Sequence, residues 1–241
     1  MSDQISIQGR DGNFSAYIAR PHIVPAPAVV VLHELFGVNS DIRKTCDELA
    51  EQGFLAIAPD LYWRQEPGIS LSVRSEDDWQ HGVRLNTAFN RDLGANDVED
   101  TVLAVTKMPE CTGKVAVMGY CIGGLMAYLT AARFRVDAAI AYHGGDTDKY
   151  LDEAAGLKSP MLMHFGEEDE FISKEARQKI KEAFAGRPNV TIYSYPGQYH
   201  AFARHGGLHY NAAAAALANG RTVKFLRREL MLQRSLGAVA S

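Results

Sequence analysis

Residues 114–124 read KVAVMGYCIGG, and this stretch decides the fold. Its first part, 114–118, has the length and apolar composition of a buried strand, and residues 123–134 have helical periodicity. The turn between them, 119–123, matches the nucleophile pattern G-x-S-x-G with cysteine in place of serine. We therefore predict that Cys121 stands in a sharp turn between a strand and a helix.

The glycines of this turn have a mechanical reason. A β-carbon at Gly119 or Gly123 would collide with the adjacent strand or helix. The helix that follows directs its amide groups and its positive dipole end at Cys121, which favours a thiolate and an oxyanion. A glycine-rich turn around a buried structural cysteine fits the same short pattern, so the rest of the sequence has to decide between the two.

Strands and helices alternate along most of the chain. Short apolar runs bounded by turn residues predict strands at 28–32, 54–58, 114–118, 138–142, 161–165 and 190–195. Helical periodicity predicts helices at 41–52, 92–108, 123–134, 173–185 and 207–232. This order is typical of an α/β fold with a mostly parallel central sheet and helices on both faces. Together with the turn around Cys121 it predicts an α/β-hydrolase fold, in one domain over residues 1–241.

Two segments depart from this alternation. Residues 5–7 and 14–18 alternate apolar with small or polar residues around 11–13, which predicts an N-terminal antiparallel hairpin at a sheet edge. Residues 61–90 are polar and carry both tryptophans. We interpret them as an excursion over one rim of the sheet, where such segments often shape substrate pockets.

Composition argues against several classes of function. The formal net charge of −4 comes from 29 acidic and 25 basic residues that are interspersed, so there is no basic stripe for nucleic acid and no polybasic patch for a membrane. The first residues lack the pattern of a secretion signal, and no apolar segment reaches the length of about 20 residues that a membrane helix needs. We expect a cytoplasmic protein whose three cysteines are free thiols.

Candidate acid and base residues follow Cys121 in the chain order of an α/β-hydrolase. The strand at 161–165 leads to Asp169, and the strand at 190–195 leads to His200. Asp169 lies far enough past its strand for the loop to fold back towards an imidazole. Three neighbouring carboxylates compete with it and otherwise belong to a solvated loop: Glu167, Glu168 and Glu170.

His200 follows the last predicted strand in a turn with proline and glycine, whereas the other histidines are expected to be structural or exposed. These others are His22, His33, His81, His143, His164, His205 and His209. His205 and His209 have the i, i+4 spacing of a metal pair, but no third ligand is near them. We expect neither a metal nor a cofactor.

An oxyanion hole needs one amide from the residue after the nucleophile, Ile122, and one from the loop after the strand at 28–32, where Leu35 is the expected donor. Glu34 lies beside Leu35, and a carboxylate close to Cys121 would disfavour the thiolate at rest. Alternatively, Glu34 caps the next helix or faces water.

Five stretches resemble the dienelactone hydrolase family of carboxymethylenebutenolidase-like proteins, over residues 5–230. They are ELFGVN at 34–39, APDLY at 58–62, GYCIGG at 119–124, GEED at 166–169 and HAFAR at 200–204. The resemblance implies a catalytic triad of Cys121, Asp169 and His200. It also implies that Glu34 partners the resting thiol and, when substrate binds, moves to take the thiol proton.

Members of that family that cleave dienelactone bind the substrate carboxylate with two arginines. Arg204 matches one of them, and a surface cation is the alternative reading. The second arginine and an aromatic partner align with Trp79 and Asn86, which departs from the family pattern. Arg84 in the same segment is the candidate for a substitute charge.

We expect Phe36 and Tyr142 to line the pocket with Trp79. The predicted activity is hydrolysis of an activated, carboxylate-bearing ester or lactone, because a thiolate is readily expelled from a tetrahedral adduct unless the other leaving group is also good. The expected partner is a small molecule, and the resemblance favours a monomer. The alternative is a non-catalytic protein of the same fold, in which Cys121 is a redox-sensing or structural thiol.

Overall fold

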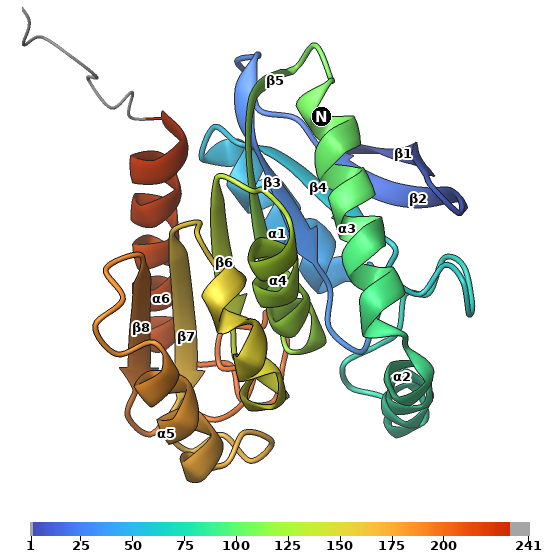
Figure 1. Ribbon diagram of the computed structural model, residues 1–241. Coiled ribbons are helices and arrows are strands. Elements are labelled where there is room, and N and C mark those ends of the chain that lie inside the picture. The colour runs from blue at the N-terminus through green and yellow to red at the C-terminus, as the bar shows by residue number, and fades with distance from the viewer. Residues whose placement is uncertain (1, 232–241) are drawn as a thin grey trace, which may run out of the picture.

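The computed structural model describes residues 2–231, and within them eight strands form one mixed sheet in the order β1-β2-β4-β3-β5-β6-β7-β8 (Figure 1). From β4 to β8 all neighbours in the sheet are parallel, whereas β2 is antiparallel to both β1 and β4. The strands are β1 (Ser2–Gly9), β2 (Gly12–Ala19), β3 (Ala26–Leu32), β4 (Leu55–Pro59), β5 (Cys111–Tyr120), β6 (Ala138–Tyr142), β7 (Met161–Gly166) and β8 (Val190–Tyr195). The predicted α/β fold, its mostly parallel sheet and its N-terminal hairpin are confirmed.

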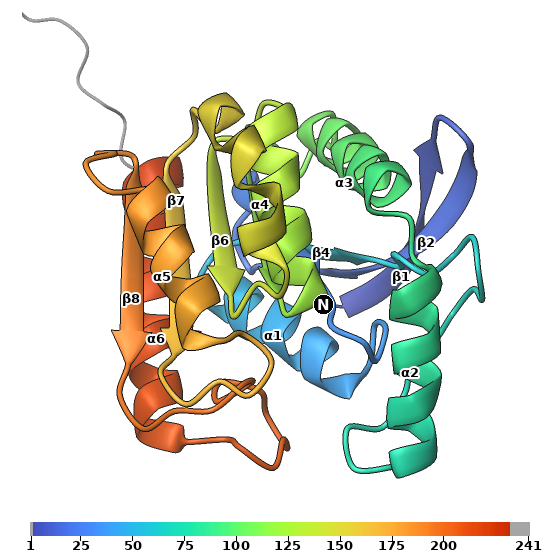
Figure 2. The ribbon, with the colours of Figure 1, turned by 60° about the horizontal axis from the view of Figure 1, so that its bottom comes forward.

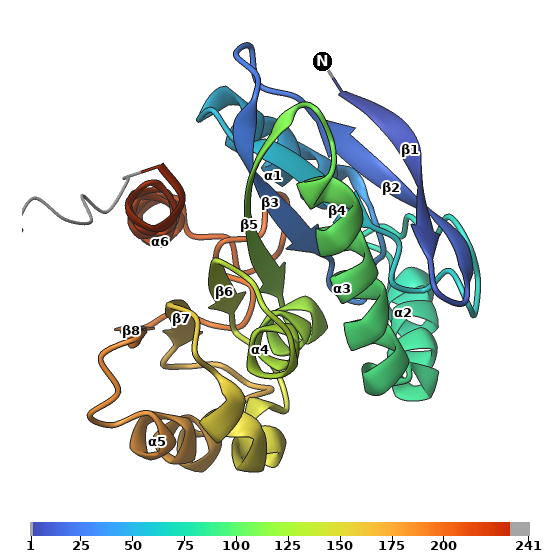
Figure 3. The ribbon, with the colours of Figure 1, turned by 45° about the horizontal axis from the view of Figure 1, so that its top comes forward.

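Helices cover both faces of this sheet. Figure 3 shows α1 and α6 on one side, and α3, α4 and α5 on the other. The helices are α1 (Ser40–Glu51), α2 (Glu76–Ala88), α3 (Arg91–Thr106), α4 (Ile122–Arg133), α5 (Lys174–Ala183) and α6 (Ala212–Leu226), with a 3₁₀ segment at Thr147–Gly156 and a π-helical segment at Arg227–Met231. No helix among the described residues is both long enough and apolar enough to cross a bilayer.

The apolar runs form buried strands because each strand contributes to two cores. Successive side chains of β3 point to opposite faces, so Val30 packs in the cluster with α3 and α4, and Val29 and Val31 pack in the cluster with α1 and α6. All residues of β3 are buried. β8 is only partly buried, because it is the last strand at its edge of the sheet.

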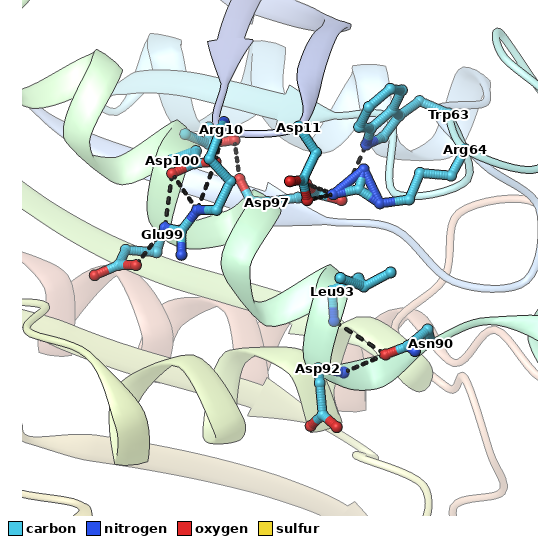
Figure 4. A network of polar contacts seen from close by, with 11 residues as sticks. Arg10, Asp11, Trp63, Arg64, Asn90, Asp92, Leu93, Asp97, Glu99 and Asp100 are labelled. Atoms are coloured by element: carbon cyan, nitrogen blue, oxygen red, sulfur yellow. Dashed lines mark hydrogen bonds and ion pairs between the residues drawn. The ribbon is translucent and has the colours of Figure 1, made fainter.

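A polar network attaches the hairpin turn to α3 (Figure 4). The guanidinium of Arg10 forms ion pairs with Asp100 at 2.7 Å and with Glu99 at 2.5 Å. Beside it, Asp97 accepts from the indole of Trp63 at 2.9 Å and pairs with Arg64, also at 2.9 Å. The outermost strands are thus attached to a helix through charged side chains.

Two sequence-based predictions of helices need correction, one for a helix that was not expected and one for a starting residue. Residues 61–90 contain the helix α2, which begins after Ser75 because the Ser75 hydroxyl accepts from the backbone N–H of Asp78. The last helix starts at Ala212 and not at residue 207, because the Asn211 side chain caps it. The expected end of that helix at residue 232 lies outside the described residues.

Helix α2 does not cover either face of the sheet. Figure 2 shows it towards the end of the molecule at which β6 and β8 end. A β-carbon on Gly82 of α2 would overlap the Leu35 carbonyl, so the helix lies directly on the loop after β3. The excursion therefore adds a helical wall at the carboxyl ends of the strands, where ligands bind in open α/β sheets.

Candidate active site

Cys121 stands between the end of β5 and the start of α4, with a φ angle of 53°. This left-handed conformation is uncommon for a residue with a β-carbon and stores strain, as often happens at functional sites. The backbone N–H of Cys121 donates to the Tyr142 carbonyl at 3.0 Å, which ties the turn to β6. A β-carbon on Gly119 would overlap Gly123, and one on Gly123 would overlap the Leu32 carbonyl. The glycines allow the close approach that holds Cys121 in this turn.

The loops after β7 and β8 bring Asp169 and His200 together. Asp169 Oδ2 accepts from Nδ1 of His200 at 2.8 Å, while Oδ1 accepts from the backbone N–H groups of Phe171 and Ile172, each at 2.9 Å. Burial raises the pKa of Asp169, but the hydrogen bond from His200 and the positive charge of that ring hold the pKa below its ordinary value. Asp169 is therefore an anion that orients the imidazole and fixes which nitrogen carries the proton.

The three glutamates around Asp169 are exposed. Glu170 accepts from the backbone N–H of His200 at 3.1 Å, so it holds the main chain of the histidine and not its ring. Among these four carboxylates, only Asp169 is buried against the imidazole.

The second ring nitrogen of His200, Nε2, is buried, and the Cys121 side chain is the group among residues 2–231 that interacts with it. Burial lowers the pKa of His200, but the negative charge of Cys121 and the hydrogen bond to Asp169 raise it to about 10. The pKa of His200 therefore depends on the charge of the neighbouring sulfur, and a negative charge there favours the protonated ring.

Glu34 is the second residue after β3. Its side chain is buried and contacts two nitrogen donors. Its Oε2 accepts from Nε of Arg204 at 2.5 Å, and its Oε1 faces Nε2 of His143 at 3.4 Å. Burial raises the pKa of Glu34, but the charge of Arg204 and the hydrogen bond from His143 lower the pKa to about 2. The expectation that Glu34 partners the resting thiol needs correction, because in the described chain its carboxylate binds Arg204 and His143.

The backbone amides of Leu35 and Ile122 lie in the loop after β3 and at the first residue of α4. Within the described residues neither amide donates to a protein acceptor.

An aromatic wall extends from α2 to His200. The rings of Phe36 and Trp79 are 6.0 Å apart, those of Trp79 and Phe171 are 5.8 Å apart, and Phe171 lies edge-on to His200 at 5.0 Å. The guanidinium of Arg204 lies 5.1 Å from the centre of the Phe36 ring. The Arg204 guanidinium thus lies against one end of this row of aromatic rings.

The dienelactone hydrolase family model matches residues 14–230. This chain belongs to the dienelactone hydrolase family. The carboxymethylenebutenolidase of Pseudomonas putida is 39% identical to it over 227 residues, which cover 94% of this chain and 96% of the relative. The carboxymethylenebutenolidase 1 of Cupriavidus pinatubonensis is 35% identical, with 94% and 97% covered.

A solved structure of a Klebsiella pneumoniae protein proposed to be a dienelactone hydrolase superposes with a TM-score of 0.84. It is 27% identical, and the match covers 95% of this chain and 98% of that one. The chain is thus a carboxymethylenebutenolidase-like hydrolase.

The segment of α2 that was expected to bind a substrate carboxylate differs from the expectation. Arg84 is exposed, and five residues along a helix place it about 140° away from Trp79. Asn86 lies on nearly the same helical face as Trp79, and its side-chain oxygen accepts from Arg91 at 3.1 Å. Arg91 also donates to the backbone carbonyls of Asn86 and Phe89, so it holds the C-terminal end of α2.

The expectation that Tyr142 lines the pocket also needs correction. Its ring is fully buried in the core under α6, and its hydroxyl bonds Thr222 at 2.7 Å and Asn219 at 2.9 Å. Because side chains alternate along a strand, the residue next to it, His143, points to Glu34 and His200. Its position directly after a predicted strand was the one signal that could have found it.

Among residues 2–231 no group of three or more histidine, cysteine or acidic side chains could hold a metal ion. The i, i+4 histidines have separate partners: His205 lies 3.1 Å from Glu48, and His209 lies 3.2 Å from Glu170. Each of them therefore pairs with a different surface carboxylate.

Proposed function

We propose that this hydrolase cleaves an activated, carboxylate-bearing ester or lactone of the dienelactone type, with Cys121 as the nucleophile. The observation that carries the proposal is the 2.8 Å hydrogen bond between Asp169 and His200, with the other nitrogen of the same ring buried beside the Cys121 sulfur. A nucleophile, a base and an acid that orients the base form the three parts of a triad.

Arg204 is the proposed anchor for the substrate carboxylate, and Glu34 is the proposed switch. At rest the Arg204 guanidinium is occupied by Glu34 at 2.5 Å. A substrate carboxylate that binds Arg204 competes with Glu34 and releases it to take the proton of the Cys121 thiol. The nucleophile is then formed when an anionic substrate is present.

In the acylation step the Cys121 thiolate attacks the carbonyl carbon, and the Leu35 and Ile122 amides stabilise the oxyanion. The adduct collapses with cleavage of the carbon–oxygen bond. The enolate that leaves takes a proton from Glu34, which restores the Glu34 carboxylate.

In the second step water hydrolyses the thioester. In the resting thiol and in the acyl thioester the sulfur carries no negative charge, so the interaction that raises the pKa of His200 is absent and the ring is neutral. Neutral His200 then accepts a proton from water at Nε2, and the hydroxide attacks the thioester. Expulsion of the Cys121 thiolate, which takes the proton back from His200, regenerates the enzyme.

Substrates with good leaving groups suit this chemistry. A thiolate is expelled from a tetrahedral adduct more readily than an amine or a simple alkoxide, so an enolate leaves efficiently and an amine does not. We therefore expect hydrolysis of enol-lactones and p-nitrophenyl esters, and no peptide hydrolysis.

The proposal is tested with Cys121→Ala and His200→Ala on an enol-lactone and on a p-nitrophenyl ester. We expect Cys121→Ala to fall to the rate in buffer. We expect His200→Ala to lose turnover while intact-protein mass spectrometry detects the acyl group on the enzyme, because deacylation needs the base.

Cys111→Ala is the matched control, since Cys111 is the other partly exposed thiol and lies at the opposite end of β5. It should retain wild-type turnover. Unchanged turnover in both Cys121→Ala and His200→Ala would contradict the proposed mechanism.

A further inference from the structure

His143 is the first residue after β6, and the proposed reaction steps do not use it. Its φ angle is 38°, its side chain is fully buried, and its backbone N–H donates to the His164 carbonyl at 2.7 Å. Strain of this kind at a residue other than glycine persists only where the surrounding structure enforces it, and such residues cluster at functional sites.

The ring of His143 lies between two groups of the proposed site. Its Nε2 is 3.4 Å from Oε1 of Glu34, and its centre is 4.4 Å from the centre of the His200 ring. Its other nitrogen, Nδ1, is buried and has no hydrogen-bond partner within the described residues. The contact with Glu34 is therefore the side chain's one polar interaction in that part of the chain.

The protonation state of His143 follows from these surroundings. Burial and the positive charge of His200 lower the pKa of His143 to about 4, so the ring is neutral at pH 7. A neutral imidazole that faces a carboxylate donates from the nitrogen nearest to it, so Nε2 carries the proton and Nδ1 does not.

The two donors of Glu34 bind different oxygens. Arg204 binds Oε2, and His143 faces Oε1. When a substrate carboxylate takes Arg204, the carboxylate of Glu34 keeps one donor. Removal of both donors would leave a buried carboxylate with no partner, which favours its protonated form.

We propose that His143 is a positioning residue that retains and orients the ionised Glu34 carboxylate while the substrate occupies Arg204. This inference rests on the proposed role of Glu34 as the acceptor of the thiol proton. His143 then acts through Glu34 and does not itself contact the substrate.

Titratable and charged groups face the Glu34–His143 pair from several elements. They are Arg204, His200, Asp169, Asp41, His33, Tyr62, Tyr120 and His164. His143→Leu leaves all of them in place and removes one donor, so the change in Glu34 is the expected cause of a shifted pH profile. Because His143 lowers the pKa of Glu34, its removal raises that pKa. As the pH falls, Glu34 in the variant is then protonated at a higher pH than in wild type, and activity is lost at that higher pH.

The experiment compares kcat, KM and the pH profile of kcat for wild type, His143→Leu and His143→Gln on one anionic enol-lactone. Hydrogen bonds to charged groups predict that His143→Leu lowers kcat about tenfold to hundredfold and leaves KM within about twofold. The acidic limb should move up by about one pH unit. His143→Gln, whose amide can donate in the place of Nε2, should recover most of kcat and the wild-type limb.

Loss of packing alone would lower the rate at all pH values equally and would not be repaired by glutamine. An unshifted acidic limb in His143→Leu, or a His143→Gln variant no better than His143→Leu, would overturn the inference. His81→Leu, on exposed α2 and paired with Glu66, is the control and should leave the profile unchanged. If Cys121→Ala were active, the proposed function itself would fail; if it is inactive and only the His143 result is negative, the role of His143 alone is wrong.

Discussion

Two arginine–carboxylate clusters in this molecule use the same chemistry in opposite surroundings. At the hairpin turn, Arg10 pairs with Glu99 and Asp100 while 39% of its side chain is exposed. In the site, Arg204 pairs with Glu34, and the side chains are only 13% and 7% exposed. The Arg10 cluster lies at the surface, and the Arg204–Glu34 pair lies beside the aromatic wall.

The two clusters differ in solvent exposure, and this gives them different energetic properties. Exposed ion pairs are screened by water and contribute little, so the Arg10 cluster serves mainly to orient the hairpin on α3. A buried pair costs desolvation energy, and loss of one partner leaves an uncompensated charge. The Arg204–Glu34 pair is therefore a poor device for stability, but it responds strongly to a competing anion.

The largest effect is expected for Arg204→Met. It leaves the Glu34 carboxylate buried without its cation, which should lower the free energy of unfolding by about 3–5 kcal/mol in urea titrations at pH 7. The double variant Arg204→Met/Glu34→Gln should recover much of this loss, because no charge is then buried. A single variant as stable as wild type would show that the pair is effectively solvated.

The pH dependence of stability should reveal the same pair. The pKa of Glu34 is lowered from 4.5 to about 2, so its contribution is fully present above pH 4.5 and is lost as the pH falls through 2. The shift corresponds to about 3 kcal/mol. Unfolding titrations between these pH values should show a steeper loss for wild type than for Glu34→Gln; parallel curves would contradict the lowered pKa.

Variants in the two clusters should also differ in their effect on KM for a charged substrate. Arg204→Met should raise KM for an anionic enol-lactone by about tenfold or more, the scale of one charge-assisted hydrogen bond, and raise it much less for a neutral ester. Arg10→Met is the matched control and should change neither value. Equal effects of Arg204→Met on both substrates would exclude the proposed carboxylate anchor.

The smallest effect is expected for Arg10→Ala. It should lower the free energy of unfolding by about 0.2–1 kcal/mol at low salt and by less at high salt, because exposed pairs are screened. Activity should remain at the wild-type level. A loss as large as that of Arg204→Met would mean that the hairpin contributes far more to folding than its exposure indicates.

The sequence predicted the sheet because its strands depend on local patterns. Apolar runs identified the strands β3 to β8, and Cys121, Asp169 and His200 follow β5, β7 and β8, whose carboxyl ends lie at one edge of the sheet. The helix α2 was not predicted because it lies in the polar segment 61–90, which we interpreted as an excursion over the rim. Its packing on Leu35 is a tertiary contact that no local pattern encodes.

What the sequence determined by itself is the set of chemical groups at the strand ends: the strained turn of Cys121, the carboxylate of Asp169 and the imidazole of His200. The charge states and the hydrogen-bond partners of the site residues depend on tertiary packing. Glu34 and Arg204 are 170 residues apart in the chain, so no spacing encodes their ion pair. Successive side chains of a strand point to opposite faces, and pairing with the neighbouring strands fixes which face each residue occupies. In β6 this pairing directs Tyr142 towards α6, and His143, the next residue, faces Glu34 and His200.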